Sequence, residues 1–185
     1  DAIEAEIESL MTTGTEDLRV GSNELGRAQR LDNGTGAARY IEFVKNTFPR
    51  NLRLNGLKVV VDCAHGAAYK VAPSVLWELG ADVIPLGGDP NGFNINKDCG
   101  SLYPEHMAAK VKDVGADFGM ALDGDADRIV VCDELGTIID GDQILAAIAR
   151  RWHQSGELSG NGVVSTVMSN LGLERYLESL GLGLE

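Results

Sequence analysis

Apolar and polar positions alternate along the chain with two different spacings. In residues 1–11 the apolar side chains recur at the spacing of one helical face. A second helical pattern covers residues 37–49 and ends at a proline. Residues 12–35, which lie between these patterns, are polar, rich in glycine and without a regular period. Such a stretch is typical of a connection between domains.

From residue 57 onward, short apolar runs alternate with longer amphipathic runs. The runs typical of buried strands are 57–66, 82–87, 116–124 and 161–170, and residues 129–140 resemble two short strands around a turn. Helical patterns cover 71–81, 101–116, 141–156 and 171–181. Ser101 is expected to cap the second of these helices, with Pro104 in its first turn. Asp140 is expected to cap the third.

This alternation predicts an α/β fold with a mixed or parallel sheet flanked by helices. Residues 1–35 are interpreted as the end of a first domain and a linker, and residues 36–139 as a second, complete α/β domain. Residues 140–185 are expected to begin a third α/β domain and to leave it incomplete. The chain begins with Asp1 rather than methionine, so we expect it to be an internal piece of a longer protein.

Charge and cysteine content narrow the range of partners and compartments. The net charge of −12 argues against nucleic acids and anionic membranes as partners, because their phosphates would be repelled. No apolar run has the length of a membrane span, and no signal peptide is recognisable. Cys63, Cys99 and Cys132 form an odd set without a C-x-x-C pair, which favours a reducing, cytoplasmic compartment. Cys63 and Cys132 lie in apolar strand patterns and are expected to be buried and unreactive.

The most informative chemistry lies in the sequence DGDADR at residues 123–128, which we call the aspartate loop. Asp123, Asp125 and Asp127 follow the apolar run FGMAL and therefore lie at the carboxyl end of a strand, where open α/β sheets usually bind ligands. Three carboxylates at alternate positions repel one another unless a cation lies between them. Their hard oxygen atoms suit Mg²⁺, Ca²⁺ or Mn²⁺ rather than Zn²⁺. The sequence therefore predicts a metal site, with a solvated acidic turn as the alternative.

Three other interpretations of the loop were weighed. An EF-hand requires glycine at its sixth position, where this chain has Arg128, and helices rather than strands on either side, so it is rejected. A phosphatase of the haloacid dehalogenase type would use Asp123 as its nucleophile, but it does not explain Asp127 or Arg128. A non-catalytic Ca²⁺-binding module would predict selectivity for Ca²⁺. The last two remain open at this point.

The sequence DGDADR resembles the metal-binding signature of the α-D-phosphohexomutases. The surrounding segments VVVDCAHGAAY, PNGFNINKDCGS, MALDGDADR, IIDGDQILAAIA and VSTVMSNLGLERYL are similar to the phosphoglucosamine mutase branch of that family. The resemblance extends from about Ala37 to the end of the chain. Residues 1–11 resemble the end of the first domain of the family.

The resemblance implies the activity of a longer protein. Such an enzyme interconverts glucosamine 6-phosphate and glucosamine 1-phosphate through a phosphoserine, with Mg²⁺ held by Asp123, Asp125 and Asp127. Other phosphohexomutases, acting on mannose or glucose phosphates, are the alternative. Arg128 would lie near the reacting phosphate or would pair with the aspartates.

The resemblance also implies what this chain lacks and what it would meet. No segment matches the motif of the nucleophilic serine or the C-terminal phosphate-binding loop, so the chain contains no catalytic residue of that kind. We expect the chain alone to be inactive. Its partners would be the phosphosugar and the remaining domains of the same protein.

Overall fold

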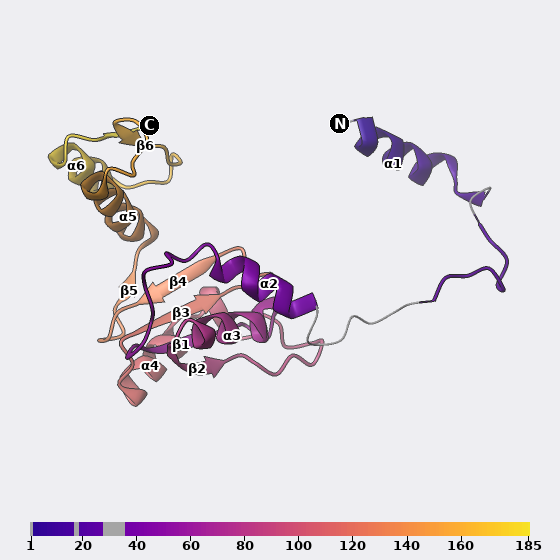
Figure 1. The fold of residues 1–185 in the computed structure, drawn as a ribbon, viewed down its shortest axis with the longest axis horizontal. Helices are drawn as coiled ribbons and strands as arrows, with labels where there is room; N and C mark the ends of the chain where they lie inside the picture. Colours follow the sequence, from indigo (N-terminus) through magenta and orange to yellow (C-terminus); the bar gives the residue numbers. More distant parts are fainter. Residues whose placement is uncertain (1, 17–18, 28–35) are drawn as a thin grey trace. The chain divides into compact units, whose positions relative to one another are not determined.

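The computed structural model describes residues 2–16, 19–27 and 36–185 (Figure 1). The chain divides into two compact units, Asp1–Gly36 and Ala37–Glu185. In the first unit, α1 (Ala2–Thr13) is a helix without a buried residue. The connection expected at residues 12–35 includes positions 17–18 and 28–35, which lie outside the described residues.

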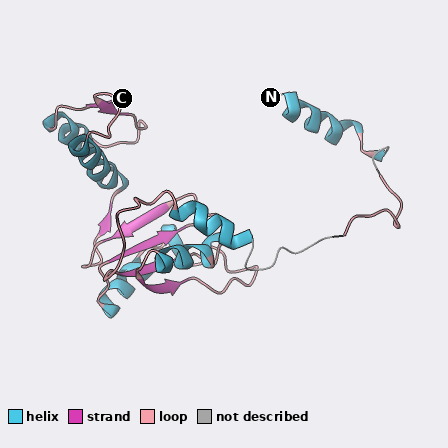
Figure 2. Cartoon of the chain, viewed as in Figure 1, coloured by secondary structure: helices cyan, strands magenta, loops and turns pink. Residues whose placement is uncertain are grey.

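A five-stranded sheet forms the centre of the second unit (Figure 2). Its strands are β1 (Lys58–Asp62), β2 (Asp82–Leu86), β3 (Phe118–Leu122), β4 (Ile129–Cys132) and β5 (Ile138–Ile139), in the order β2-β1-β3-β4-β5. Strand β1, second in this order, pairs in parallel with both β2 and β3. The pairs β3–β4 and β4–β5 are antiparallel. The expected α/β class is therefore confirmed, and the sheet is of the mixed kind.

Helices cover both faces of this sheet (Figure 1). On one face lies α4 (Glu105–Val114), whose Met107 and Val111 pack in one core cluster with Val60 and Ala121. On the other face lie α2 (Gly36–Lys45) and α3 (Val71–Glu78), which share a second core cluster. Two 3₁₀ turns, η2 (Ala67–Tyr69) and η3 (Gly100–Leu102), follow the loops at the carboxyl ends of β1 and β2. The domain thus has three layers, helix, sheet and helix.

The helix expected at residues 101–116 begins later than its sequence pattern suggests. Ser101 lies in η3 and does not cap α4; Pro104 occupies the position before the first helical residue, and no side chain makes a capping bond there. Tyr103 has φ −132° and ψ 58°, outside the helical region. Steric conflict with a following proline disfavours the helical conformation, so the helix cannot run through Tyr103. The prediction of Ser101 as the cap is therefore wrong.

The last part of the chain contains α5 (Gly141–Ser155), β6 (Gly162–Val163), α6 (Leu171–Ser179) and β7 (Gly183–Leu184). The expected cap Asp140 is confirmed: its side chain accepts a hydrogen bond from the Asp142 N–H (2.8 Å), while Gln143 bonds back to the Asp140 N–H. The strand expected over 161–170 is wrong beyond Val163, because β6 pairs with β7 over two residues only. Ala149, Leu173 and Leu177 form the core of this part.

None of the helices in the described part of the chain combines the length and apolar character needed to cross a membrane.

Candidate metal centre

The candidate site lies at one edge of the five-stranded sheet. Because β1, β2 and β3 are parallel, their carboxyl ends meet at the same edge. Three loops therefore converge there: residues 63–67 after β1, the long loop after β2, and the aspartate loop after β3. The aspartate loop is also the turn of the β3–β4 hairpin, since Leu122 and Ile129 are paired on either side of it.

The structure brings the three predicted metal ligands together. Asp123, Asp125 and Asp127 each offer a carboxylate oxygen, and these atoms all lie within 4.8 Å of one another. Asp123 is buried, with only 1% of its surface exposed, whereas Asp125 and Asp127 are exposed. Ala126 adopts a left-handed conformation with φ 62°, which turns the chain back between the second and third aspartates. The cluster thus consists of one buried carboxylate at its base and two carboxylates that are open to solvent.

Hydrogen bonds fix the carboxylate of Asp123. Its Oδ1 accepts from the backbone N–H of Asp127 (3.1 Å) and of Arg128 (3.0 Å), and its Oδ2 accepts from Nε of Arg128 (2.8 Å). The main-chain carbonyl of Asp123 also accepts from the Ala126 N–H (3.1 Å). A buried carboxylate is stable only when it is paired in this way. The loop is thus organised around Asp123.

The charges of the loop act on one another. The backbone N–H of Arg128 is the main group that lowers the pKa of Asp123 to about 2; burial opposes the shift and the Arg128 guanidinium adds to it. Repulsion by Asp125 is the main cause that raises the pKa of Asp127. The hydrogen bond to Asp123 raises the pKa of Arg128. Asp125 and Asp127 therefore form the part of the loop in which negative charge is least compensated.

The donor set fits a hard divalent cation. Carboxylate oxygens are the ligands that Mg²⁺ prefers, and Mg²⁺ commonly binds to a few carboxylates while it keeps open positions for water or phosphate. Each oxygen of Asp123 can accept more than one bond, so its contacts with Arg128 do not prevent it from also binding a cation. The side chain of Arg128 is 67% exposed, and its Nε also lies 3.6 Å from Asp127 Oδ1. The pairing of Arg128 with the aspartates, one of the two predicted roles, is therefore observed.

Neighbouring loops pack closely against the aspartate loop. The N–H of Ala67 donates to the Gly124 carbonyl (2.8 Å). Gly66 lies so close to Gly124 that a Cβ on Gly66 would collide with its backbone. On another side, a Cβ added to Gly124 would lie 2.8 Å from the Asn96 Nδ2. Asn96 Oδ1 is buried and has no hydrogen-bond partner among the residues that the structure describes.

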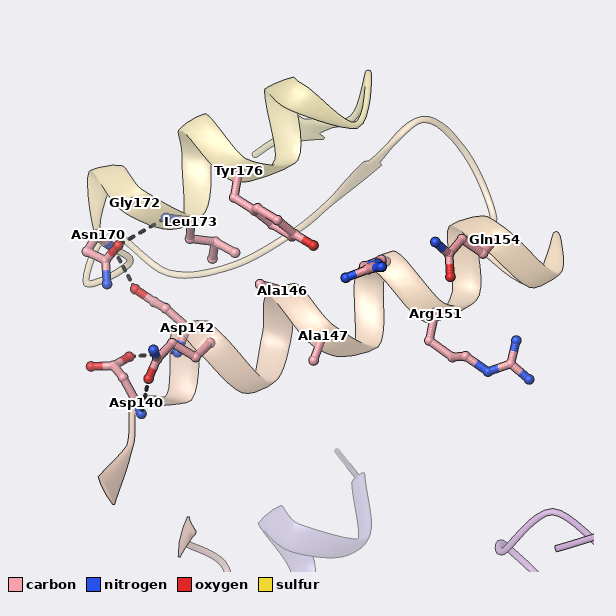
Figure 3. A pocket seen from close by; sticks show the side chains of 12 residues that line it. Asp140, Asp142, Ala146, Ala147, Arg151, Gln154, Asn170, Gly172, Leu173 and Tyr176 are labelled. Atoms are coloured by element: carbon pink, nitrogen blue, oxygen red, sulfur yellow. Dashed lines mark hydrogen bonds between the residues drawn. The ribbon is translucent and has the colours of Figure 1, made fainter. Parts of the chain in front are cut away.

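Two of the cavities in this unit of the chain differ in their relation to the site. One, of about 410 Å³, is lined by Asp125 and Ala126 of the aspartate loop and by apolar side chains of α2, α3 and β3. The other, of about 840 Å³, lies between α5 and α6 (Figure 3) and shares no lining residue with the aspartate loop. Its acidic residues are engaged in capping: Asp142 accepts from the Asn170 N–H (2.7 Å) at the end where the two helices begin. The aspartate loop therefore borders the smaller of these two cavities.

Sequence reasoning missed two residues that shape this edge. Asp62 is buried at the end of β1 and accepts hydrogen bonds from the N–H groups of Ala64 and Gly100. Its position directly after the apolar run VVV resembles that of Asp123 after FGMAL, and this parallel was a usable signal. Asn96 had no such signal, because nothing in the polar loop after β2 marks one asparagine as having a buried side-chain oxygen.

The chain is similar to known proteins along most of its length. Residues 38–136 match the family model described as "Phosphoglucomutase/phosphomannomutase, alpha/beta/alpha domain II", and residues 140–185 match the model of domain III of the same family. The chain is 64% identical over 182 residues to phosphoglucosamine mutase of Paramagnetospirillum magneticum, covering 98% of this chain and 40% of that protein. It is 61% identical over 184 residues to phosphoglucosamine mutase of Rhodospirillum rubrum, covering 100% of this chain and 40% of that protein.

Solved structures show the same fold. A phosphoglucomutase/phosphomannomutase family protein from Burkholderia thailandensis superposes with a TM-score of 0.67 at 28% identity, covering 80% of this chain and 32% of that one. The chain spans about 40% of the length of the curated relatives it matches. The matched models cover most of the sequence, so the chain belongs to the phosphoglucomutase/phosphomannomutase family, the α-D-phosphohexomutases, and contains its domain II and part of its domain III.

Proposed function

We propose that this chain is the metal-binding segment of a phosphoglucosamine mutase and that Asp123, Asp125 and Asp127 bind Mg²⁺. One observation supports the proposal above all: three carboxylate oxygens within 4.8 Å of one another at the carboxyl edge of the sheet. It occurs in a chain that is 64% and 61% identical to two phosphoglucosamine mutases. The longer protein would interconvert glucosamine 6-phosphate and glucosamine 1-phosphate.

Each residue of the loop has a distinct task in this proposal. Asp123 is the fixed ligand at the base, and Asp125 and Asp127 supply the exposed oxygens. When bound, Mg²⁺ neutralises negative charge on a phosphoryl group during transfer. Arg128 orients Asp123 through Nε, and its exposed guanidinium end can donate to a phosphate oxygen, because a guanidinium has five donors.

The chain would supply only part of the catalytic apparatus. Residues 36–139 act as the second domain and residues 140–185 as part of the third, and the phosphoserine comes from a domain outside this chain. Phosphoryl transfer depends mainly on positioning and on charge stabilisation, so all of these parts must assemble around the phosphosugar. The three cysteines are free thiols, which suits a cytoplasmic enzyme.

Binding of Mg²⁺ is tested by an NMR titration of the ¹⁵N-labelled chain. Addition of Mg²⁺ should shift the amide signals of residues 124–128 before any others, because these groups surround the carboxylates. Asp125→Asn should weaken the response on the order of tenfold, since it removes a ligand charge at nearly constant volume. We expect the affinity to be weak, because Mg²⁺ gives up its water reluctantly.

A matched control comes from the opposite edge of the same sheet. Asp82→Asn removes an exposed carboxylate at the amino end of β2 and should leave the titration unchanged. The metal assignment is wrong if the loop amides move no more than those near scattered surface carboxylates. Selective binding of Ca²⁺ in place of Mg²⁺ would favour a Ca²⁺-binding module instead.

Catalysis is tested by a coupled assay for the isomerisation of glucosamine 6-phosphate. The chain alone should show no turnover, because the reaction needs a phosphoserine and a phosphate-binding loop from other domains. Isomerase turnover that copurifies with the chain would contradict the proposal. Phosphatase turnover that is abolished by Asp123→Asn would instead support the dehalogenase-type alternative, although both oxygens of Asp123 are already engaged in hydrogen bonds.

A further inference from the structure

Asp62 is a buried acid that is not among the proposed metal ligands. It is the last residue of β1, which lies between β2 and β3, and only 1% of its surface is exposed. Each of its oxygens accepts a hydrogen bond from a different segment: Oδ1 from the Ala64 N–H (2.9 Å) and Oδ2 from the Gly100 N–H (2.8 Å). Burial of a carboxylate is costly, so its presence here calls for a role that an apolar residue could not fill.

The first of these segments reaches one side of Asp123. The bond from Ala64 closes a tight turn in which both Ala64 and His65 have positive φ, at 52° and 50°. The turn places Gly66 directly against the backbone of Gly124. The next residue, Ala67, donates its N–H to the Gly124 carbonyl (2.8 Å). Asp62 Oδ1 therefore fixes the segment that contacts the residue after Asp123.

The second segment reaches the other side of Asp123. Gly100 has φ 74°, and a Cβ added to it would lie 2.5 Å from the Leu122 carbonyl oxygen and 2.5 Å from the Ala64 Cβ. The contact is so close that only glycine fits. Asp62 Oδ2 therefore fixes the segment that contacts the residue before Asp123. The two segments also touch each other, at Ala64 and Gly100.

We propose that Asp62 is a positioning residue for the aspartate loop: its two oxygens anchor two segments that clamp Leu122 and Gly124, the neighbours of Asp123. An aspartate suits this task because one planar carboxylate accepts two N–H bonds in different directions, whereas asparagine has one acceptor oxygen only. The significance of this role for metal binding rests on the proposed function. The anchoring of the loop itself does not.

Amide hydrogen exchange of the full 185-residue chain tests the proposal without any metal. In Asp62→Asn, the new NH₂ group faces one of the two N–H donors, so one of the two segments loses its anchor. The amides of Asp127 and Arg128, which donate to Asp123 Oδ1, should then exchange at least about tenfold faster. The Mg²⁺ affinity in the NMR titration should fall by a similar factor. Exchange of the amides around Leu177, in the core formed by α5 and α6, should not change.

Asp117→Asn is the matched control. Asp117 Oδ2 accepts a hydrogen bond from the N–H of Lys58 (2.7 Å), which lies at the opposite end of β1 from Asp62. It should accelerate exchange at Lys58 only. Asp62→Asn could instead accelerate amide exchange at Ala64 and Gly100 while the amides of Asp127 and Arg128 keep their protection. Asp62 would then be a local structural residue, and the proposal would be overturned.

Two further outcomes keep the test decisive. If Asp62→Asn does not fold, exchange in the unmodified chain as a function of urea replaces it. The amides of Ala64, Gly100, Asp127 and Arg128 should then open with one common denaturant dependence, and independent opening would refute the inference. If Asp62→Asn accelerates exchange in the loop but the unmodified chain binds no Mg²⁺, the metal assignment fails while the positioning role stands.

Discussion

Asp62 and Asp123 are both buried carboxylates at the carboxyl ends of neighbouring strands, and each comes directly after an apolar run. Asp123 has carboxylates at the next two alternate positions and an arginine beside them, a pattern that points to a cation site. The residues that follow Asp62, beginning with Cys63 and Ala64, include no further carboxylate nearby. Its hydrogen-bond partner Gly100 lies 38 residues away in the sequence. A residue whose partners are distant in sequence gives no local pattern. The three candidate metal ligands could therefore be predicted from the sequence, whereas the hydrogen bonds of Asp62 could not.

The cysteines behave as their sequence context predicts. Cys63 and Cys132 are buried free thiols, and Cys99 is partly exposed. Burial is the main cause that raises the pKa of Cys63 from 9.0 to about 12, and the charge of Asp62 adds to the shift. The predicted burial of Cys63 and Cys132 is therefore confirmed, and their low reactivity stays a prediction.

The shifted pKa of Cys63 predicts how stability depends on alkaline pH. Above about pH 9 the unfolded chain releases the thiol proton, whereas the folded chain keeps it until about pH 12. The folded state then binds more protons than the unfolded state, so this group lowers the free energy of unfolding as the pH rises, by at most about 1.4 kcal/mol per pH unit. Below pH 9 it has no such effect.

Urea unfolding at several values between pH 8 and pH 11 measures this contribution. Cys63→Ala should reduce the fall in the free energy of unfolding over this range. Cys99→Ala, the control at a partly exposed thiol, should reduce it less. Identical slopes for Cys63→Ala and the unmodified chain would show that the buried thiol ionises as freely as in the unfolded state.

At the scale of elements, local signals succeeded where several of them agreed. Helix α5 has an apolar face, an Asp140 cap and a glycine, Gly156, in the left-handed conformation at its end, and it was predicted closely. The two short strands around residues 133–137 were also predicted, since apolar runs on both sides of a turn are typical of a hairpin.

Other elements depend on contacts that a local pattern does not contain. The apolar residues of 161–170 resemble a strand, but Val164, Val167 and Met168 are exposed and unpaired in the part of the chain that the structure describes. A strand requires a neighbour over its whole length. The short strand β7 was missed because two paired residues are below the length at which a periodic pattern can be recognised.

At the scale of the whole molecule, the described residues contain separate cores. Met107 packs with Val60 and Ala121 in the sheet domain, while Leu177 packs with Ala149 and Leu173 in the last part of the chain. These two clusters share no residue. We expect the regions 37–139 and 140–185 to respond separately to core mutations.

A reciprocal pair of substitutions tests this independence. Met107→Ala and Leu177→Ala each remove a fully buried side chain and should each cost about 2–5 kcal/mol in the region that contains them. Residue-resolved hydrogen exchange should show lost protection at β1 and β3 in the first variant and at α5 and α6 in the second. Equal loss of protection everywhere in both variants would show that residues 37–185 unfold as one cooperative unit.

The strand order of the sheet domain also bears on how the domain folds. The β3–β4 pairing closes a loop of only a few residues, whereas the β1–β3 pairing joins Val59 to Phe118. Closing a short loop costs less entropy, and hairpins form within about 1–10 μs. The aspartate loop is the turn of the β3–β4 hairpin, so it can form early. Asp62 comes close to the loop only when β1 pairs with β3. We therefore expect the turn that carries the proposed ligands to form before the parallel pairing brings Asp62 to its place beside the neighbouring loops.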